Sequence, residues 1–205
     1  MGVISNGTTL LDAGAIDSGV PTGAMTLIKT LTASSSATLD FLNGASNVVF
    51  DGTYDEYVFK FYNIHPATNG ADFTFQADTG TNTNYNIAMT TTYFRAAHGE
   101  DGSGDSLTYD AGRDLAQGTG FLQVISGIGN DADGNGNGTL HIFSPSSSTF
   151  VKNFIIRSCT SYEDGIARDM FIAGYFNTTT ALTRVRFKMS SGNIDSGVIK
   201  LYGIK

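Results

Sequence analysis

Hydrophobic residues recur at every second position in several stretches of this chain, which is the period of a β-strand that is buried on one side. Residues 71–78 show this most clearly, because the odd-numbered residues are apolar and the even-numbered ones are polar. This stretch predicts a half-buried strand with Phe73 and Phe75 in the core. Truncation of a core phenylalanine to alanine is expected to cost about 3–5 kcal/mol.

Two further stretches extend this pattern. Residues 182–189 predict a strand with Val185, Phe187 and Met189 on its core face and a row of basic residues on the other. Residues 57–64 have apolar side chains at both odd-numbered and even-numbered positions, which is typical of a central strand that is covered on two sides or lies against another subunit.

The remaining strand candidates are separated by turn residues such as Asn43-Gly44 and Asp51-Gly52, which tolerate positive φ angles. These candidates are residues 25–32, 37–42, 85–94, 121–126, 138–143, 150–159, 168–176 and 198–204. Only residues 110–117 and 162–169 predict a short helical turn. The pattern predicts an all-β fold, a single jelly-roll-like antiparallel β-sandwich of about ten or eleven strands.

The chain divides into two parts by composition. Residues 1–24 are rich in Gly and small polar residues and predict an extended N-terminal arm, either poorly ordered or ordered against another subunit. Residues 25–205 predict the β-sandwich domain. No apolar run approaches a membrane span, and the first residues lack the basic start of a signal peptide.

Charge is distributed unevenly along the 205 residues. Residues 1–150 carry 15 acidic and 4 basic side chains, whereas residues 151–205 carry 4 acidic and 8 basic ones. The overall net charge of -7 argues against nucleic-acid binding, which requires a basic surface. The basic C-terminal quarter indicates either a solvated sheet face or a surface that meets an acidic neighbour.

Several short motifs resemble sites without completing one. Residues 131–138 space oxygen donors as in a calcium loop, but Ile142 stands where a bidentate glutamate is needed. Residues 98–105 bring His98 and three carboxylates into a glycine-rich loop, where we expect neither a metal nor acid/base chemistry. His65 and His141 stand alone and predict structural roles.

We expect no enzymatic activity. The sequence lacks a nucleophile elbow, a phosphate loop and a dinucleotide fingerprint, and it predicts no catalytic residues, no cofactor and no metal. The lone Cys159 is expected to be a small buried residue within a strand.

Five segments of the chain carry a resemblance to a known family. They are MTLIKTLTASSSATLDF, YVFKFYNIHPATNGADFTFQ, DLAQGTGFLQ, GTLHIFSPSSSTFVKNF and FIAGYFNTTTALTRVRFKMSSGNIDSGVIKLYGIK. From residue 25 almost to the end, the chain resembles small β-rich virion structural proteins of tailed phages that infect marine bacteria, of the cyanophage and pelagiphage type. Its final SSGNIDSGVIKLYGIK is the most specific segment.

The resemblance implies a non-enzymatic protein on the surface of the virion, assembled in the host cytoplasm. It implies a capsid decoration (cement) protein or a small tail-associated subunit, and does not separate head from tail. Proteins of this kind are commonly trimers, so the expected partners are further copies of the chain and the major capsid or tail protein. The alternative is a tail-fibre, receptor-binding adhesin that recognises host surface glycans.

Overall fold

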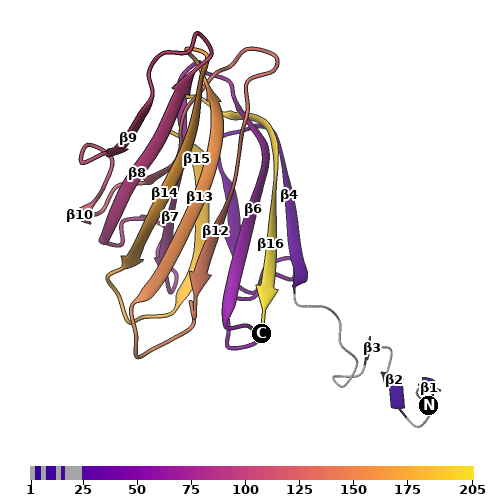
Figure 1. The fold of residues 1–205 in the computed structure, drawn as a ribbon. Coiled ribbons are helices and arrows are strands. Elements are labelled where there is room, and N and C mark those ends of the chain that lie inside the picture. The colour runs from indigo at the N-terminus through magenta and orange to yellow at the C-terminus, as the bar shows by residue number, and fades with distance from the viewer. Residues whose placement is uncertain (1–2, 6–7, 13–14, 17–24) are drawn as a thin grey trace.

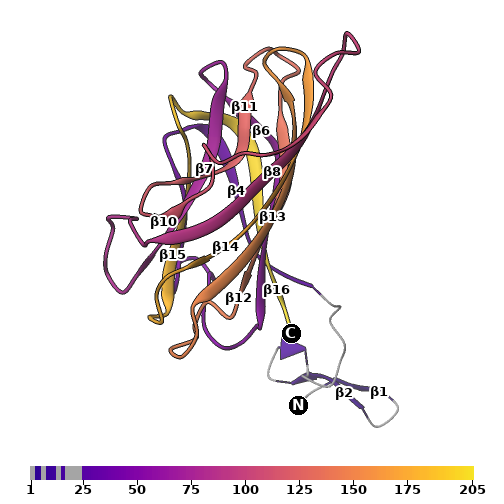
Figure 2. The same cartoon turned by 60° about the vertical axis from the view of Figure 1, so that its left-hand side comes forward.

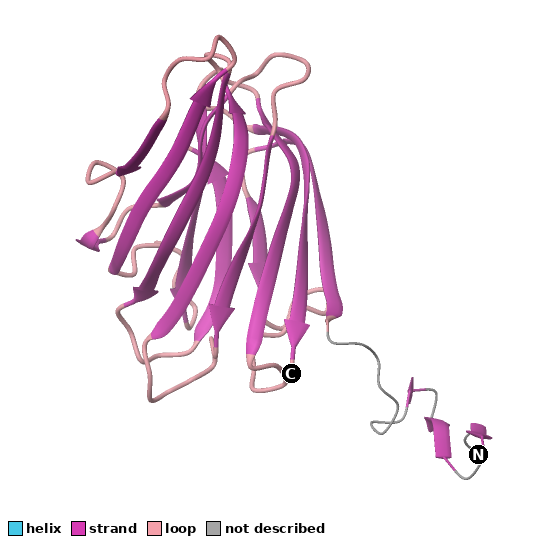
Figure 3. Ribbon diagram, in the orientation of Figure 1, coloured by secondary structure: helices cyan, strands magenta, loops and turns pink. Residues whose placement is uncertain are grey.

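The computed structural model describes residues 3–5, 8–12, 15–16 and 25–205, and all of its regular elements are strands (Figures 1 and 3). Among these residues no helix is long and apolar enough to cross a membrane. The strands are β1 (Val3–Ser5), β2 (Thr8–Asp12), β3 (Ala15–Ile16), β4 (Thr26–Ser36), β5 (Leu39–Leu42), β6 (Glu56–Pro66), β7 (Ala71–Thr79), β8 (Met89–Gly99), β9 (Ser106–Tyr109), β10 (Ala116–Gly118), β11 (Leu122–Ile128), β12 (Gly136–Phe143), β13 (Lys152–Tyr162), β14 (Ile166–Phe176), β15 (Leu182–Met189) and β16 (Ile194–Ile204).

Strands β4 to β16 form one antiparallel sheet that folds over on itself into two layers (Figure 2). The long layer has the order β4-β16-β6-β12-β13-β14-β8, and β9 and β10 pair with the outer edge of β8. The short layer has the order β5-β15-β7-β11 and joins the long one where Ile128 pairs with Tyr162. Because β4 and β5 also contact each other, the sheet is nearly closed. The all-β, antiparallel prediction is confirmed.

A cluster of phenylalanine rings fills the space between the layers. Phe187 of β15 lies at its centre, stacked on Phe73 at a centroid distance of 5.5 Å. Rings of both layers meet here, since Phe187 also contacts Phe59 and Phe61 of β6 at 5.3 Å each. The predicted core residues are all buried: Phe73, Phe75, Val185 and Phe187. The stretch 57–64 is a central strand, as its pattern indicates, and lies in β6 between β16 and β12.

Strand β7 differs from the half-buried strand that its alternation predicts. The polar residues Thr74, Gln76 and Asp78 are buried as well. Two loops cover Gln76 and Asp78: Gln76 Nε2 donates to the carbonyl oxygens of Ile87 and Gly120 at 3.0 and 3.1 Å, and Asp78 Oδ2 accepts from the amide of Tyr85 at 2.8 Å. Thr74 Oγ1 donates instead to the carbonyl oxygen of Lys188 in β15 at 2.9 Å. These buried polar residues are tolerated because each has a hydrogen-bond partner.

Other predicted elements also differ from those of the structure. The predicted helical turns are wrong, because residues 110–117 form turns followed by the start of β10 and residues 162–169 form the β13–β14 hairpin. Two short strands, β9 and β10, escaped prediction. In the arm, β1, β2 and β3 pair with one another, while residues 1–2, 6–7, 13–14 and 17–24 lie outside the described residues, so the arm remains a prediction.

A lysine is buried at the start of β13. The side chain of Lys152 is fully shielded from solvent, and its Nζ donates to the carbonyl oxygens of Phe150 and Thr178 at 2.9 and 3.2 Å. No carboxylate lies within ion-pairing distance of it in residues 25–205. Burial therefore lowers the pKa of Lys152 below its ordinary value of 10.5.

This buried lysine predicts a pH dependence of stability. Between the folded pKa and 10.5 the unfolded chain binds more protons at Lys152 than the folded chain does, so the free energy of unfolding rises with pH. Lys152→Met lacks this contribution. Urea denaturation from pH 7 to 10.5 should show wild type gaining stability relative to Lys152→Met, and parallel curves would contradict the prediction.

Candidate functional site

The outer face of the long layer carries exposed hydrophobic side chains. We call the outer face the side of β8, β9, β13 and β14 that is turned away from the core. Phe94, Leu107, Tyr109 and Ile155 all lie on it and are exposed. An apolar cluster of this kind on a sheet surface is typical of an interaction site.

The pairing register of the strands aligns Tyr109 and Phe94 with two further side chains into a ridge. Tyr109 pairs with Phe94, Phe94 with Phe171, and Phe171 with Arg157, so the four lie in one row across β9, β8, β14 and β13. The rings of Phe94 and Phe171 are parallel within 1° at a centroid distance of 4.9 Å. The guanidinium of Arg157 lies 4.5 Å from the centroid of Phe171. Both faces of Phe171 are therefore covered by neighbouring side chains.

An ion pair fixes the basic end of this ridge. Arg157 Nη2 lies 2.8 Å from Asp169 Oδ2, and Arg157 Nε donates to Asp169 Oδ1 at 3.3 Å. The hydrogen bonds to Asp169 raise the pKa of Arg157 above its ordinary value. Because the pair is exposed, it orients Arg157 over Phe171 rather than adding much stability.

Two hollows flank the ridge. The larger, of about 600 Å³, lies over small side chains, among them Ala96, Ala167 and Cys159, with Asp169 and His98 at its border. The smaller, of about 420 Å³, lies beside Thr92, Ala173 and Ile155. A ridge between two hollows is a shape that side chains of a second protein surface can interlock with.

The prediction that Cys159 is buried is wrong, because its thiol side faces solvent at the larger hollow. Its neighbours Ser158 and Thr160 point inward instead, where Ser158 Oγ donates to the carbonyl oxygen of Val124 and Thr160 Oγ1 donates to that of Asn135 at 3.0 Å. The strand itself was expected correctly, but the inward positions at this end of β13 are polar.

The calcium-like loop uses its oxygens internally. Asn137 Oδ1 accepts from the amide of Asn63 at 2.9 Å, and Asn135 Oδ1 accepts from Asn137 Nδ2 at 2.6 Å. His65 Nδ1 lies 2.6 Å from the carbonyl oxygen of Gly134. Within the described part of the chain, no three His, Cys, Asp or Glu residues gather as metal ligands would.

The histidine loop is an exposed excursion after β8. His98 Nδ1 contacts Asp105 Oδ1, and both side chains are largely exposed. Asp101 instead accepts from the amide of Ser103 at 2.9 Å, so the loop's carboxylates do not converge on the imidazole. His141 pairs with Glu56, so His65 and His141 each have a structural partner.

Two arginines of the basic C-terminal quarter, Arg157 and Arg186, form ion pairs with carboxylates of the described residues. Arg186 donates to both oxygens of Asp40, at 2.8 and 2.6 Å, and its guanidinium lies 4.1 Å from the centroid of Tyr85. Lys188 Nζ lies 4.5 Å from the ring centroid of Phe121. These contacts hold the covering loops on the short layer rather than forming an open basic surface.

Comparison of the chain with protein-family models, with curated proteins and with solved structures finds no match. The site is therefore argued from its geometry.

The sequence contains a signal for the outer face that alternation alone does not use. Adjacent hydrophobic pairs, namely Tyr93-Phe94, Ile155-Ile156 and Phe171-Ile172, occur in three strands that become neighbours. Such a pair places one large apolar side chain on each face of a strand. The outer member of each pair contributes to the apolar outer face.

Proposed function

We propose that this protein is a non-enzymatic structural protein of a phage particle, a jelly-roll-like sandwich exposed on the virion surface that assembles as a homotrimer. In this role it is a capsid decoration protein or a small tail-associated subunit. The observation that carries the proposal is the apolar outer face, with its ridge of Tyr109, Phe94 and Phe171 between two hollows. The resemblance of the sequence to phage structural proteins supports it.

Ring orientation favours a protein partner over a glycan. Sugars bind aromatic side chains through the open face of a ring, but the faces of Phe171 lie against Phe94 and under Arg157. Exposed apolar side chains beside the ridge, among them Leu107 and Ile155, pack well against side chains of another subunit. Recognition of host surface glycans by a tail-fibre adhesin is therefore the second candidate, and a glycan array probed with the intact protein tests it.

An apolar interface of this kind predicts sensitivity to one introduced charge. Ile155→Asp is expected to weaken self-association about tenfold or more, because the carboxylate would be buried without a partner between subunits. The matched control is Leu27→Asp, since Leu27 is 53% exposed against 52% for Ile155 but lies on β4 at the opposite edge of the long layer. Light scattering coupled to size-exclusion chromatography measures the mass.

Wild type and Leu27→Asp should show three times the chain mass of 21.7 kDa at concentrations where Ile155→Asp dissociates. A monomeric wild type, or an Ile155→Asp variant that associates as tightly as wild type, would contradict the outer face as the interface.

The arm is proposed as the anchor to the particle. A variant lacking residues 1–24 should keep its fold, because the strands β4 to β16 pair with one another and not with the arm. Without the anchor it should incorporate into particles at reduced occupancy. Quantitative gel analysis of purified particles measures the occupancy, and normal occupancy would show that the arm is not the anchor.

The virion role itself is tested by immunogold electron microscopy on intact particles. Label over the head supports decoration, and label at the tail supports a tail-associated subunit. Detergent-opened particles serve as the control for hidden epitopes, and absence of label from both preparations would overturn the proposal.

A further inference from the structure

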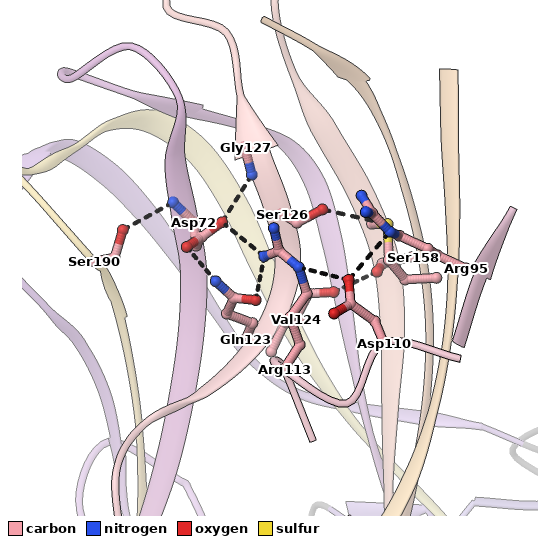
Figure 4. A network of polar contacts seen from close by, with 11 residues as sticks. Asp72, Arg95, Asp110, Arg113, Gln123, Val124, Ser126, Gly127, Ser158 and Ser190 are labelled. Atoms are coloured by element: carbon pink, nitrogen blue, oxygen red, sulfur yellow. Dashed lines mark hydrogen bonds and ion pairs between the residues drawn. The ribbon is translucent and has the colours of Figure 1, made fainter. Parts of the chain in front are cut away.

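Three arginines gather on the inner side of the long layer, next to β7 and β11 of the short layer. Arg95 of β8 and Arg168 of β14 lie on the opposite side of the sheet from Phe94 and Asp169. Arg113, from the turn before β10, shares the carboxylate of Asp110 with Arg95 (Figure 4), and its charge also acts on Arg168. We call these three side chains the arginine cluster.

Two carboxylates only partly neutralise the arginine cluster. Asp110 Oδ2 lies 3.0 Å from Arg113 Nε and 3.2 Å from Arg95 Nε, while Asp72 Oδ1 lies 3.7 Å from Arg113 Nη1. Asp72 also accepts from the amide of Gly127 at 2.9 Å and from Gln123 Nε2 (Figure 4). Within residues 25–205, Arg168 forms no ion pair, so three guanidinium groups face two carboxylates.

The cluster also holds donors that have no acceptor. In the described part of the chain, five buried side-chain nitrogen or oxygen atoms lack a hydrogen-bond partner. Four of them are here: Arg168 Nε and Nη1, Arg95 Nη1 and the Tyr93 hydroxyl. Unpaired buried donors are rare in proteins because each costs about 1–3 kcal/mol, more when the group is charged.

Electrostatics shows that these groups influence one another. Burial, and after it the charge of Arg95, lowers the pKa of Arg168. Burial raises the pKa of Tyr93 to about 12, so its hydroxyl remains a protonated donor at neutral pH. The cluster is therefore an excess of positive charge surrounded by unused donors.

Only part of the cluster opens to solvent. A hollow of about 410 Å³ is lined by Arg95, Asp110, Arg113 and Gln123. The Arg168 guanidinium lies flat on the ring of Tyr162, 3.2 Å from its centroid, and so is held in place by stacking.

We propose that the arginine cluster binds a small oxyanion, namely phosphate, sulfate or the carboxylate of an organic acid. Its oxygen atoms would accept from Arg95 and Arg113, which line the hollow, and its negative charge would offset the unpaired charge of the neighbouring Arg168. Guanidinium groups suit this role because they present several donors in a plane to phosphate and carboxylate oxygens. The site is separate from the outer face and does not depend on the proposed virion role.

Thermal denaturation of the full chain with inorganic phosphate tests this site, in Tris-chloride buffer with sodium chloride matched for ionic strength. Wild type should show a melting temperature that rises with phosphate and is half-saturated below about 10 mM, since a ligand bound only to the folded state stabilises it. Titrations with sulfate and acetate then define which oxyanion is preferred.

Arg168→Gln should weaken phosphate binding at least tenfold, and without phosphate it should melt no lower than wild type because an uncompensated charge is gone. The matched control is Arg184→Gln, which removes an arginine of β15 in the short layer and should leave the phosphate response unchanged. Arg95→Gln removes a donor that lines the hollow and should weaken binding several-fold even if Arg168→Gln fails to fold.

Three results would overturn the site. They are a wild-type melting temperature that phosphate raises no more than chloride does, an undiminished response in Arg168→Gln, and, where that variant does not fold, an undiminished response in Arg95→Gln.

Discussion

Phe187→Ala is expected to lower the free energy of unfolding by about 3–5 kcal/mol. The ring is fully buried and touches rings from both layers, so its removal leaves a cavity that neither layer alone can close. Its partners are Phe41, Phe59, Phe61, Phe73 and Phe75, at centroid distances of 6.2, 5.3, 5.3, 5.5 and 6.1 Å. Chemical denaturation monitored by circular dichroism measures the change.

The control for this prediction is Phe150→Ala. Phe150 is 71% exposed, so the same truncation should change stability by less than about 0.5 kcal/mol. A Phe187→Ala variant as stable as this control would show that the two layers do not pack through Phe187.

Gly127→Ala is expected to destabilise the protein by about 2–5 kcal/mol, the second largest effect. Gly127 has a φ of +58°, which costs an alanine about 1–2 kcal/mol. Its added Cβ would also lie 1.6 Å from Cε2 of Tyr162, and relieving this overlap should cost about 1–3 kcal/mol more. Moving Tyr162 would also displace Arg168 from its stacked position.

Gly44→Ala separates the two causes. Gly44 has a φ of +81° but no atom within 4 Å of the added Cβ, so only the backbone cost remains. Urea denaturation of both variants should show Gly127→Ala as the less stable, and equal losses would mean that Tyr162 moves freely.

Strand positions were accessible from the sequence because alternation is a local property. Residues 71–78 and 182–189 lie in strands of the sheet, nine other predicted stretches lie in or overlap with strands, and Phe73, Phe75, Val185 and Phe187 occupy the core as expected. β9 was missed because it has only four residues, so the alternation of Leu107 and Tyr109 with Ser106 and Thr108 is too short to stand out.

The candidate site could not be predicted from the sequence as the strands could. Residues of the ridge come from four strands, and Tyr109 meets Phe94 and Phe171 only through the pairing of β9, β8 and β14. The side of the strand on which Cys159 lies could not be predicted, because in the pair Ile155-Ile156 either residue can face the core. Packing against the short layer places Ile156 in the core, which leaves the odd-numbered residues of this strand, Cys159 among them, on the outer face.

The sequence by itself determined an all-β chain and the residues that share each side of a strand, because side chains alternate along any extended backbone. Tertiary structure decided which side meets the other layer, which polar residues lie under loops, and which charges gather. Gln76 is buried and Arg157 is exposed for that reason, although both stand in alternating strands. Burial and charge clustering depend on contacts between residues far apart in the chain, and local periodicity does not encode them.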